Sequence, residues 1–548
     1  MREQLRVVLA VARDPGLARI ELAYLGFNMA EYATWIAILV WAYTRGGAAA
    51  AALVAFIQLM PAALMAPFAA YAGDRYRQDR VLLAAYLLQA ATLAATGIAL
   101  YLDAPFPLVV LAATLASVSF TVTRPVQAVM LPSVTHTPAD LTAANTVSGL
   151  SESIGIFIGP FVGGVVLGRF GPGEVFLTFS FISFIAAVLV ARLPIFPAAV
   201  ASTGTLTARE RLAESFGGFA ALRRERRVMV LVLVLSASTV VIGALDILFA
   251  AVAIDLLHAG EAWAGFLYSA FGLGGIVGTV ATVALVGRRR MTPAFAGSSG
   301  LFGFSISAIG LVATTVSAPA LFAASGAGSS ITTVAGRTLL QRTAPEAVMA
   351  RVFGVLEGLA MFALAVGAVA SGMLVESIGV SGALLVVGLL VPTVLALTWV
   401  QLGALDRNAK APDPEALELL RRLPIFAPLS AISMEKILAD MDWLHVPAGA
   451  VVIREGDEGD RFYVIADGRV AVTFGGAHLS MRGPGDGIGE IALLRNVPRT
   501  ATVTAVTPLR LIVVERVRFL AAVTGHAQSR ERAEATADAQ LRNTAAPG

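Results

Sequence analysis

The sequence predicts a membrane protein that is all-α over its long N-terminal part and ends in a small α+β domain. Hydrophobic residues make up 57% of the 548 residues and charged residues only 14%, well away from the average of soluble domains. Up to about Leu405 the apolar residues form long runs; beyond it charged residues return and the runs shorten. Long apolar runs are typical of spans that cross a bilayer, and the polar remainder is typical of a soluble domain.

Twelve stretches are long and apolar enough to cross a bilayer as helices. They lie at about 17–43, 48–72, 81–101, 107–131, 143–167, 174–192, 229–255, 263–286, 294–315, 318–336, 351–375 and 381–403. A polar central loop, 194–228, follows the sixth stretch. The sequence therefore predicts two six-helix transmembrane halves, 1–193 and 229–405.

An internal repeat supports this division. The spacing of Gly159, Gly164 and Gly171 in the first half recurs in the second half, at Gly367, Gly372 and Gly379. Halves that are built alike, with a site between them, are typical of transporters.

The arginines predict the orientation, because cytoplasmic loops of membrane proteins are enriched in positive charge. One set of loops contains Arg2, Arg6, Arg13, Arg75, Arg77, Arg80, Arg223, Arg224, Arg226, Arg227, Arg288, Arg289, Arg290 and Arg342. The other set contains only Arg45 and Arg169. We therefore expect a multi-pass protein of the cell (inner) membrane, with both termini in the cytoplasm. The net charge of +3 gives no reason to expect a nucleic-acid partner, and the absence of cysteine excludes thiolate metal sites.

Three short motifs resemble those of the major facilitator superfamily, over roughly residues 15–405. They are the loop after the second span with Asp74, Arg75 and Arg80, the run Arg124-Pro-Val-Gln127 in the fourth span, and Gly155-Ile-Phe-Ile-Gly159-Pro160-Phe-Val-Gly163-Gly164 in the fifth. The last is similar to the motif of the family's drug:proton antiporters. Ala70, Arg77 and Ala128 depart from the family pattern.

This resemblance implies a major facilitator fold and specific roles for the motif residues. Asp74 would cap the start of a helix, and Arg75 and Arg80 would hold a cytoplasmic gate closed by charge contacts. The small residues of the fifth span would allow close helix packing, and Pro160 would bend that span.

Polar residues inside the spans are the candidates for a proton or substrate pathway, because charges at membrane depth are costly and rarely idle. In the first span they share one helical face: Glu21, Tyr24, Asn28, Glu31, Tyr32 and Trp35. We assign Asn28, Glu31, Tyr32 and Trp35 to the pathway, together with Asp246 of the seventh span. Glu31 is the best candidate for a proton carrier; the alternative is a structural glutamate that is hydrogen-bonded to a neighbouring helix. Arg124 and Glu152 are expected to pair in a structural or gating role.

The remaining chain predicts a linker helix at 406–422, a β-roll domain at 423–525 and a polar tail at 526–548. From Leu444 the apolar residues alternate, with turns between short runs, which indicates strands. Residues 485–503 contain a glycine, a short helical turn and a returning arginine, a pattern suited to binding a phosphate. This stretch resembles the phosphate-binding cassette of cyclic nucleotide-binding domains.

The resemblance implies a regulatory cyclic nucleotide, cAMP or cGMP. The matching residues are Gly489, Glu490, Ile491, Ala492, Arg499, Thr500 and Ala501. Arg499 would hold the phosphate and Glu490 a sugar hydroxyl. Thr500 could bond a guanine amino group, although the choice of base stays open, and the tail could close as a lid. No cofactor is required and no metal site is predicted.

These features predict a secondary active transporter: proton-coupled efflux of a small drug-like or amphipathic molecule, regulated by a cyclic nucleotide. Its partners would be membrane lipid, protons, the substrate and the nucleotide. The alternatives are a membrane-embedded nucleotide sensor without transport and a transporter whose nucleotide-binding domain is only structural. A channel is disfavoured because no Thr-Val-Gly-Tyr-Gly filter occurs. An enzyme is disfavoured because no nucleophile, Walker or Rossmann motif occurs.

Overall fold

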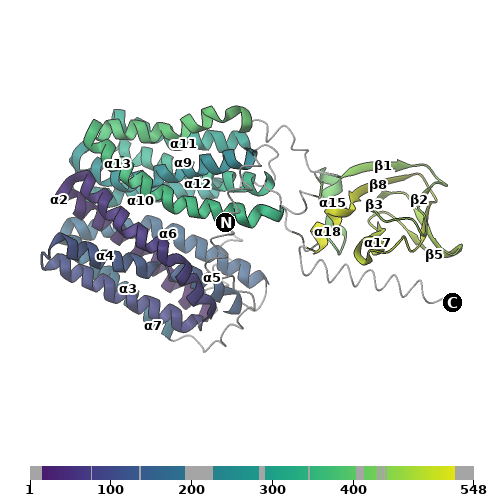
Figure 1. Cartoon of the computed structure of the whole chain (residues 1–548), viewed down its shortest axis with the longest axis horizontal. Coiled ribbons are helices and arrows are strands. Elements are labelled where there is room, and N and C mark those ends of the chain that lie inside the picture. Colours follow the sequence, from purple (N-terminus) through teal and green to yellow (C-terminus); the bar gives the residue numbers. More distant parts are fainter. Residues whose placement is uncertain are drawn as a thin grey trace. The chain divides into compact units, whose positions relative to one another are not determined.

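The structure is a computed structural model in which the chain divides into two units, between Asp406 and Arg407. It describes residues 15–75, 77–134, 138–191, 226–282, 291–343, 346–402, 413–427, 429, 434, 437, 438 and 441–524. The predicted tail and most of the predicted central loop lie outside these residues. In the described part, the first unit is helical and the strands belong to the second (Figure 1).

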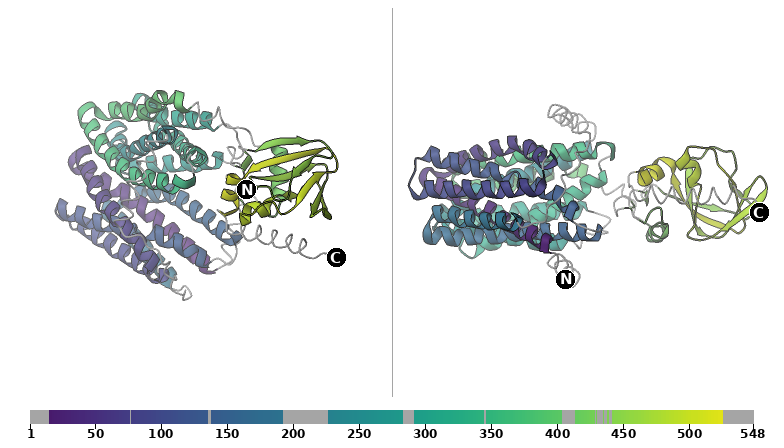
Figure 2. Two further views of the ribbon diagram at one scale, coloured as in Figure 1. Left: turned by 45° about the vertical axis from the view of Figure 1, so that its right-hand side comes forward. Right: turned by 90° about the horizontal axis from the view of Figure 1, so that it is seen from below.

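The first unit consists of helices that run side by side (Figure 2). The N-terminal half contains α2 (Pro15–Arg75), α3 (Gln78–Tyr101), α4 (Phe106–Phe120), α5 (Thr123–Val134), α6 (Pro138–Phe170) and α7 (Pro172–Ala191). The C-terminal half contains α9 (Arg226–Ala251), the π-helical turn η1 (Val252–Leu256), α10 (Ala262–Ala281), α11 (Thr292–Val312), α12 (Ser317–Thr343) and α13 (Glu346–Leu397). In Figure 1 the purple-to-blue helices form one half and the teal-to-green helices the other.

Two of these helices each cover two predicted spans. The backbone of α2 leaves helical geometry at Gly46 and Gly47, and that of α13 does so at Gly379, where φ is +74°. Within the described residues, nine helices are long and apolar enough to cross a membrane. Each of the interrupted helices α2 and α13 is counted once among these nine, although each covers two predicted spans. Helix α12 is not among the nine. The helical membrane architecture is thus present, while the number of twelve spans stays a prediction.

The repeated glycines occupy equivalent positions in the two halves. A Cβ atom on Gly159 would lie 2.6 Å from the Met29 carbonyl oxygen in α2, and one on Gly367 would lie 2.0 Å from the Val240 carbonyl oxygen in α9. Contacts this short leave no room for a side chain, so each glycine lets two helices of its own half meet backbone to backbone.

The second glycine of each set packs across the two halves instead. A Cβ atom on Gly164 would lie 2.8 Å from the Ala262 carbonyl oxygen in α10, and one on Gly372 would lie 3.0 Å from the Ala48 carbonyl oxygen in α2. The third glycine of each set has a positive φ, +99° at Gly171 and +74° at Gly379, and makes a turn. The repeat seen in the sequence therefore corresponds to a structural repeat.

The second unit is a roll of two antiparallel sheets. Its strands are β1 (Asp442–Val446), β2 (Val451–Ile453), β3 (Arg461–Asp467), β4 (Val470–Phe474), β5 (Ala477–Arg482), β6 (Gly487–Ile488), β7 (Thr502–Ala505) and β8 (Leu509–Glu515). Each sheet has four strands, in the orders β1-β8-β3-β6 and β2-β7-β4-β5. The helices of this unit are α15 (Pro414–Arg422), α17 (Glu490–Arg495) and α18 (Arg516–Thr524).

Two apolar clusters hold the roll together. Ile465, Val470 and Leu511 are fully buried between the sheets. Outside the sheets, Phe462 stacks on Phe519 of α18 with ring centroids 4.6 Å apart. Helix α15, which the sequence assigned to the linker, contributes Ala416 and Leu420 to this outer cluster. It therefore packs as part of the roll.

Replacing the packed glycines by alanine should destabilise the helical unit. We expect Gly159→Ala and Gly367→Ala each to lower the free energy of unfolding by about 1–3 kcal/mol, because the added methyl group overpacks a backbone contact. The matched controls are Gly149→Ala in α6 and Gly358→Ala in α13, which have open space around them. These controls should leave the thermal midpoint of the purified protein unchanged or raise it, since alanine favours helix. Equal midpoints for both pairs would contradict the packing argument.

Candidate functional site

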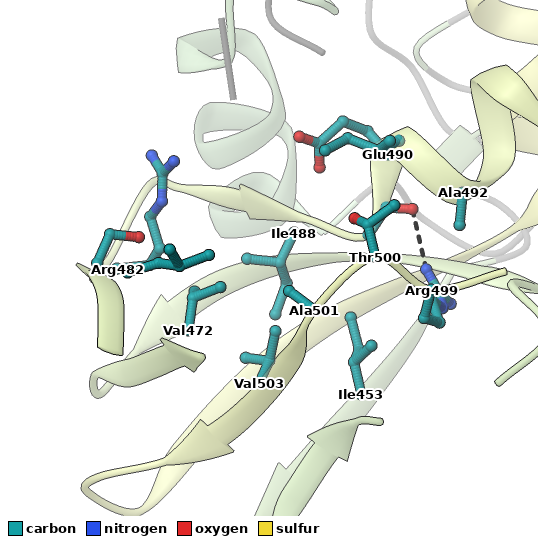
Figure 3. Close-up of a pocket in the computed structure, with 14 residues that line it drawn as sticks. Ile453, Val472, Arg482, Ile488, Glu490, Ala492, Arg499, Thr500, Ala501 and Val503 are labelled. Carbon is teal, nitrogen blue, oxygen red and sulfur yellow. Dashed lines mark hydrogen bonds between the residues drawn. The ribbon is translucent and has the colours of Figure 1, made fainter. Parts of the chain in front are cut away.

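A pocket of about 340 Å³ opens in the roll. All of the residues that the sequence assigned to phosphate and sugar binding line it: Gly489, Glu490, Ile491, Ala492, Arg499, Thr500 and Ala501. They come from α17, from the residue before it, and from the segment that leads into β7 (Figure 3). The structure thus brings these residues together around one cavity.

Arg499 is the buried cation of this pocket, with 5% of its surface exposed. Its Nη1 donates to the Gly489 carbonyl oxygen at 2.9 Å and its Nη2 to the Arg461 carbonyl oxygen at 2.7 Å. The Asp460 carboxylate approaches Nη2 only to 3.9 Å and is itself largely exposed. Burial lowers the pKa of Arg499, but an arginine keeps its proton in proteins. Two carbonyl dipoles orient this charge without neutralising it, so the pocket can accept an anion.

Gly489 is required by this arrangement. Its φ is +92°, in the left-handed region that glycine favours. A Cβ atom at this position would also lie 2.5 Å from Arg499 Nη1. The next residue, Glu490, begins α17 and is only 2% exposed. The first turn of this helix presents backbone N–H groups beside the arginine, and such groups attract anions.

The opposite wall of the pocket is apolar, with one further cation. Ile453, Val472, Ile488 and Val503 supply a surface suited to a flat ring (Figure 3). Sequence reasoning missed Arg482, which also lines the pocket. Arg482 pairs with the buried Val470 across β5 and β4, and residues paired in this way share a face of the sheet. Only the strand register reveals that Arg482 points inward.

In the helical unit, Arg124 of α5 joins two carboxylates. Its Nη1 lies 2.7 Å from Glu152 Oε1 in α6, and its Nη2 lies 2.5 Å from Glu31 Oε2 in α2. The Tyr24 hydroxyl is 3.4 Å from Nη1. The predicted contact between Arg124 and Glu152 is therefore present. The contact with Glu31 was not predicted, and it agrees with the alternative that Glu31 bonds to a neighbouring helix.

A second polar group connects the two halves. Asp246 of α9 is 7% exposed, and Trp35 of α2 lies within hydrogen-bonding reach of it. The ring of Tyr32 in α2 contacts that of Tyr268 in α10, with centroids 6.2 Å apart. Asn28 is fully buried and donates to the Tyr24 carbonyl oxygen at 2.8 Å. Trp35 and Tyr32 of α2 thus reach the other half at Asp246 and Tyr268, whereas Asn28 bonds within α2.

The fifth-span motif acts through close packing, as predicted. Cβ atoms on Gly155 and Gly163 would lie 2.4 Å from Asn28 Cβ and 3.0 Å from Ala33 Cβ. Together with Gly159 these glycines hold α6 against α2. Pro160 lies inside α6, and its carbonyl oxygen would be 2.4 Å from a Cβ atom on Gly265 of α10.

The prediction that Asp74 caps a helix start is wrong. Helix α2 continues to Arg75, so Asp74 lies in its last turn, and α3 begins at Gln78 with Arg77 at the N-cap position. The side chains of Asp74 and Arg75 lie outside the described residues. Arg80 is exposed. The ion pair in this loop joins Arg77 to Asp79 at 2.7 Å, because Arg77 replaces a glycine of the family pattern.

Relatives of the second unit are nucleotide-binding proteins. The chain is 36% identical over 118 residues to a cAMP-dependent protein kinase regulatory subunit of Yarrowia lipolytica, covering 21% of this chain and 32% of that protein. It is 35% identical over 102 residues to a cyclic nucleotide-gated potassium channel of Rhizobium etli, covering 19% and 28%. The chain thus spans about a third of the length of these curated relatives. A co-crystal structure of the regulatory domain of Toxoplasma gondii PKA with cAMP matches at 32% identity and a TM-score of 0.19, covering 20% of this chain and 43% of that one.

Two family models match the chain. The model described as cyclic nucleotide-binding domain matches residues 443–526, which contain the pocket. The model described as Major Facilitator Superfamily matches residues 20–355, more than half of the chain. The protein therefore belongs to the major facilitator superfamily and carries a C-terminal cyclic nucleotide-binding domain.

Proposed function

We propose that this protein exports a small drug-like or amphipathic molecule in exchange for protons, and that cAMP or cGMP bound in the roll regulates the exchange. The observation that carries the regulatory half is the pocket around Arg499. Its volume of about 340 Å³ lies within the usual range of small-molecule sites, about 300–1,000 Å³. Its chemistry divides into a cationic end and an apolar wall, as a nucleotide requires.

In this proposal the phosphate, the ribose and the base of the nucleotide each contact a different part of the pocket. Its cyclic phosphate would meet Arg499 and the first turn of α17, where charge-assisted hydrogen bonds are strongest. Glu490 would accept from the ribose 2′-hydroxyl. The base would rest on Ile453, Val472 and Val503. Thr500 and Arg482 are the polar groups that could distinguish adenine from guanine.

The transport half is supported by contacts that join the two halves at one end of the helices. Tyr43 at the end of the first span donates to Asp255 Oδ2 after the seventh, at 2.5 Å. The Ala49 N–H donates to Glu376 Oε1 at 3.3 Å. With the predicted orientation, this end faces away from the cytoplasm. We infer that the chain is closed outward here, as a carrier that alternates its access requires.

Removing the arginine should abolish tight nucleotide binding. We expect Arg499→Ala to cost about 2–5 kcal/mol, which weakens the Kd for cAMP or cGMP by about 30-fold or more. Arg499→Lys should recover only part of this loss, because an ammonium group does not donate in a fork. Arg454→Ala, an exposed arginine outside the pocket, is the control. Titration calorimetry of the full-length protein gives the affinities. Unchanged affinity in Arg499→Ala would reject the site.

The outer contact can be tested by labelling, because the chain has no cysteine. A cysteine at Ala48, which is 2% exposed and packs on Gly372, should react slowly with a membrane-impermeant maleimide. Tyr43→Phe removes a hydrogen bond to a carboxylate, worth about 1.5–3 kcal/mol, so labelling should become about tenfold faster or more. Tyr101→Phe, an exposed tyrosine at the end of α3, should leave it unchanged. A cysteine at the exposed Leu102 measures the full reaction rate.

The same assay tests regulation without knowledge of the substrate. Saturating cAMP or cGMP should change the labelling rate of Ala48→Cys, and this change should disappear when Arg499→Ala is added. A coupling of about 1–3 kcal/mol corresponds to about a 5–150-fold change. If the nucleotide binds and the labelling rate does not respond, the nucleotide-binding domain is only structural. If labelling responds and no solute moves in liposomes, the protein is a sensor.

A further inference from the structure

A buried carboxyl group lies near the start of α2 and forms no ion pair with another described residue. Glu21 is 5% exposed. Its Oε1 accepts a hydrogen bond from Ser148 of α6 at 2.6 Å. Its Oε2 is buried and has no hydrogen-bond partner in the described part of the chain. An ionised carboxylate in such surroundings is strongly disfavoured, so its charge must be removed or balanced.

A neighbouring amide shows the same deficit of donors. Gln127 of α5 is 3% exposed, and its Nε2 lies 3.4 Å from Ser148 Oγ. Its Oε1 is buried, again without a partner among the described residues. Ser148 thus links the carboxyl group to the amide, and two acceptors remain without donors. Buried acceptors are normally satisfied, and a single proton on Glu21 would change one of these acceptors into a donor.

Among the residues that the structure describes, the other charged and titratable groups around Glu21 do not pair with it. Tyr86 of α3 faces it with a buried hydroxyl, and Ser151 of α6 is within hydrogen-bonding reach. Arg124 of α5 is engaged by Glu31 and Glu152. The two glutamates on this face of α2 therefore differ: Glu31 forms an ion pair with Arg124, and Glu21 forms none with another described residue.

We propose that Glu21, supported by Ser148 and Gln127, is a proton-binding site separate from the Arg124 cluster and that it releases its proton toward the cytoplasm. This rests on the proposed exchange. A proton adds to one carboxylate oxygen and gives a neutral carboxyl group whose O–H is donated to a buried acceptor. On release the proton passes to water, and the carboxylate regains its charge. Glu31, which is paired with Arg124, is not part of this step.

Infrared difference spectroscopy tests this without a substrate. The full-length protein in lipid nanodiscs is compared between acidic and alkaline buffer, in H2O and in D2O. We expect a band from a protonated buried carboxyl that shifts down in D2O. It should be present in the wild type, in Glu31→Gln and in Asp246→Asn, and absent in Glu21→Gln. Ser148→Ala should move the band, because the carboxyl group loses a donor.

The outcomes separate this inference from the proposed function. If the band of the protonated carboxyl group persists in Glu21→Gln, Glu21 is not the group that binds the proton. If sodium chloride removes the band at constant pH and choline chloride does not, the site takes Na⁺ and the proton proposal is overturned. If the band behaves as expected while a pH gradient leaves the labelling of Ala48→Cys unchanged, Glu21 binds a proton and the exchange proposal fails. Circular dichroism of each variant confirms that it has folded.

Discussion

The charges of two arginines, Arg124 and Arg499, are balanced in different ways, and this difference determines what the surroundings of each can do. Arg124 meets carboxylates from two other helices, Glu31 and Glu152. Arg499 meets two backbone carbonyl oxygens and a carboxylate at 3.9 Å. The first arginine therefore joins three helices through its ion pairs, whereas the second still has charge to offer an incoming anion.

The same comparison separates the two carboxylates of α2. Glu31 is the best candidate for a proton carrier by its depth in the first span, but the structure pairs it with Arg124. Glu21 is nearer the helix start, yet it is buried and lacks such a partner. The depth of a residue along a helix can be counted in the sequence. The side chain that faces Glu31 cannot be identified in this way, because Arg124 belongs to α5, about a hundred residues later in the chain.

The pocket was predictable from the sequence to the extent that its geometry is local. Gly489, Glu490 and Arg499 belong to one continuous stretch, and a left-handed glycine followed by a short helix leaves few ways to arrange them. Arg482 was missed because its inward position depends on pairing with Val470. The expectation for Asp74 failed because α2 extends further than the motif implies. The prediction from the glycine repeat was confirmed because the lack of a side chain allows close helix packing in both halves.

That repeat also bears on how the halves could move. Gly164 packs against the backbone of Ala262 across the halves, and Gly372 packs against Ala48 and Ala52. Such contacts are short-ranged, so a small separation loses most of their attraction. The end of the helices where these glycines lie is therefore expected to be either packed or open, with few intermediate arrangements. An element with two arrangements needs only a modest bias: a free energy of about 1–3 kcal/mol, within reach of one bound nucleotide or one proton, shifts its populations severalfold or more.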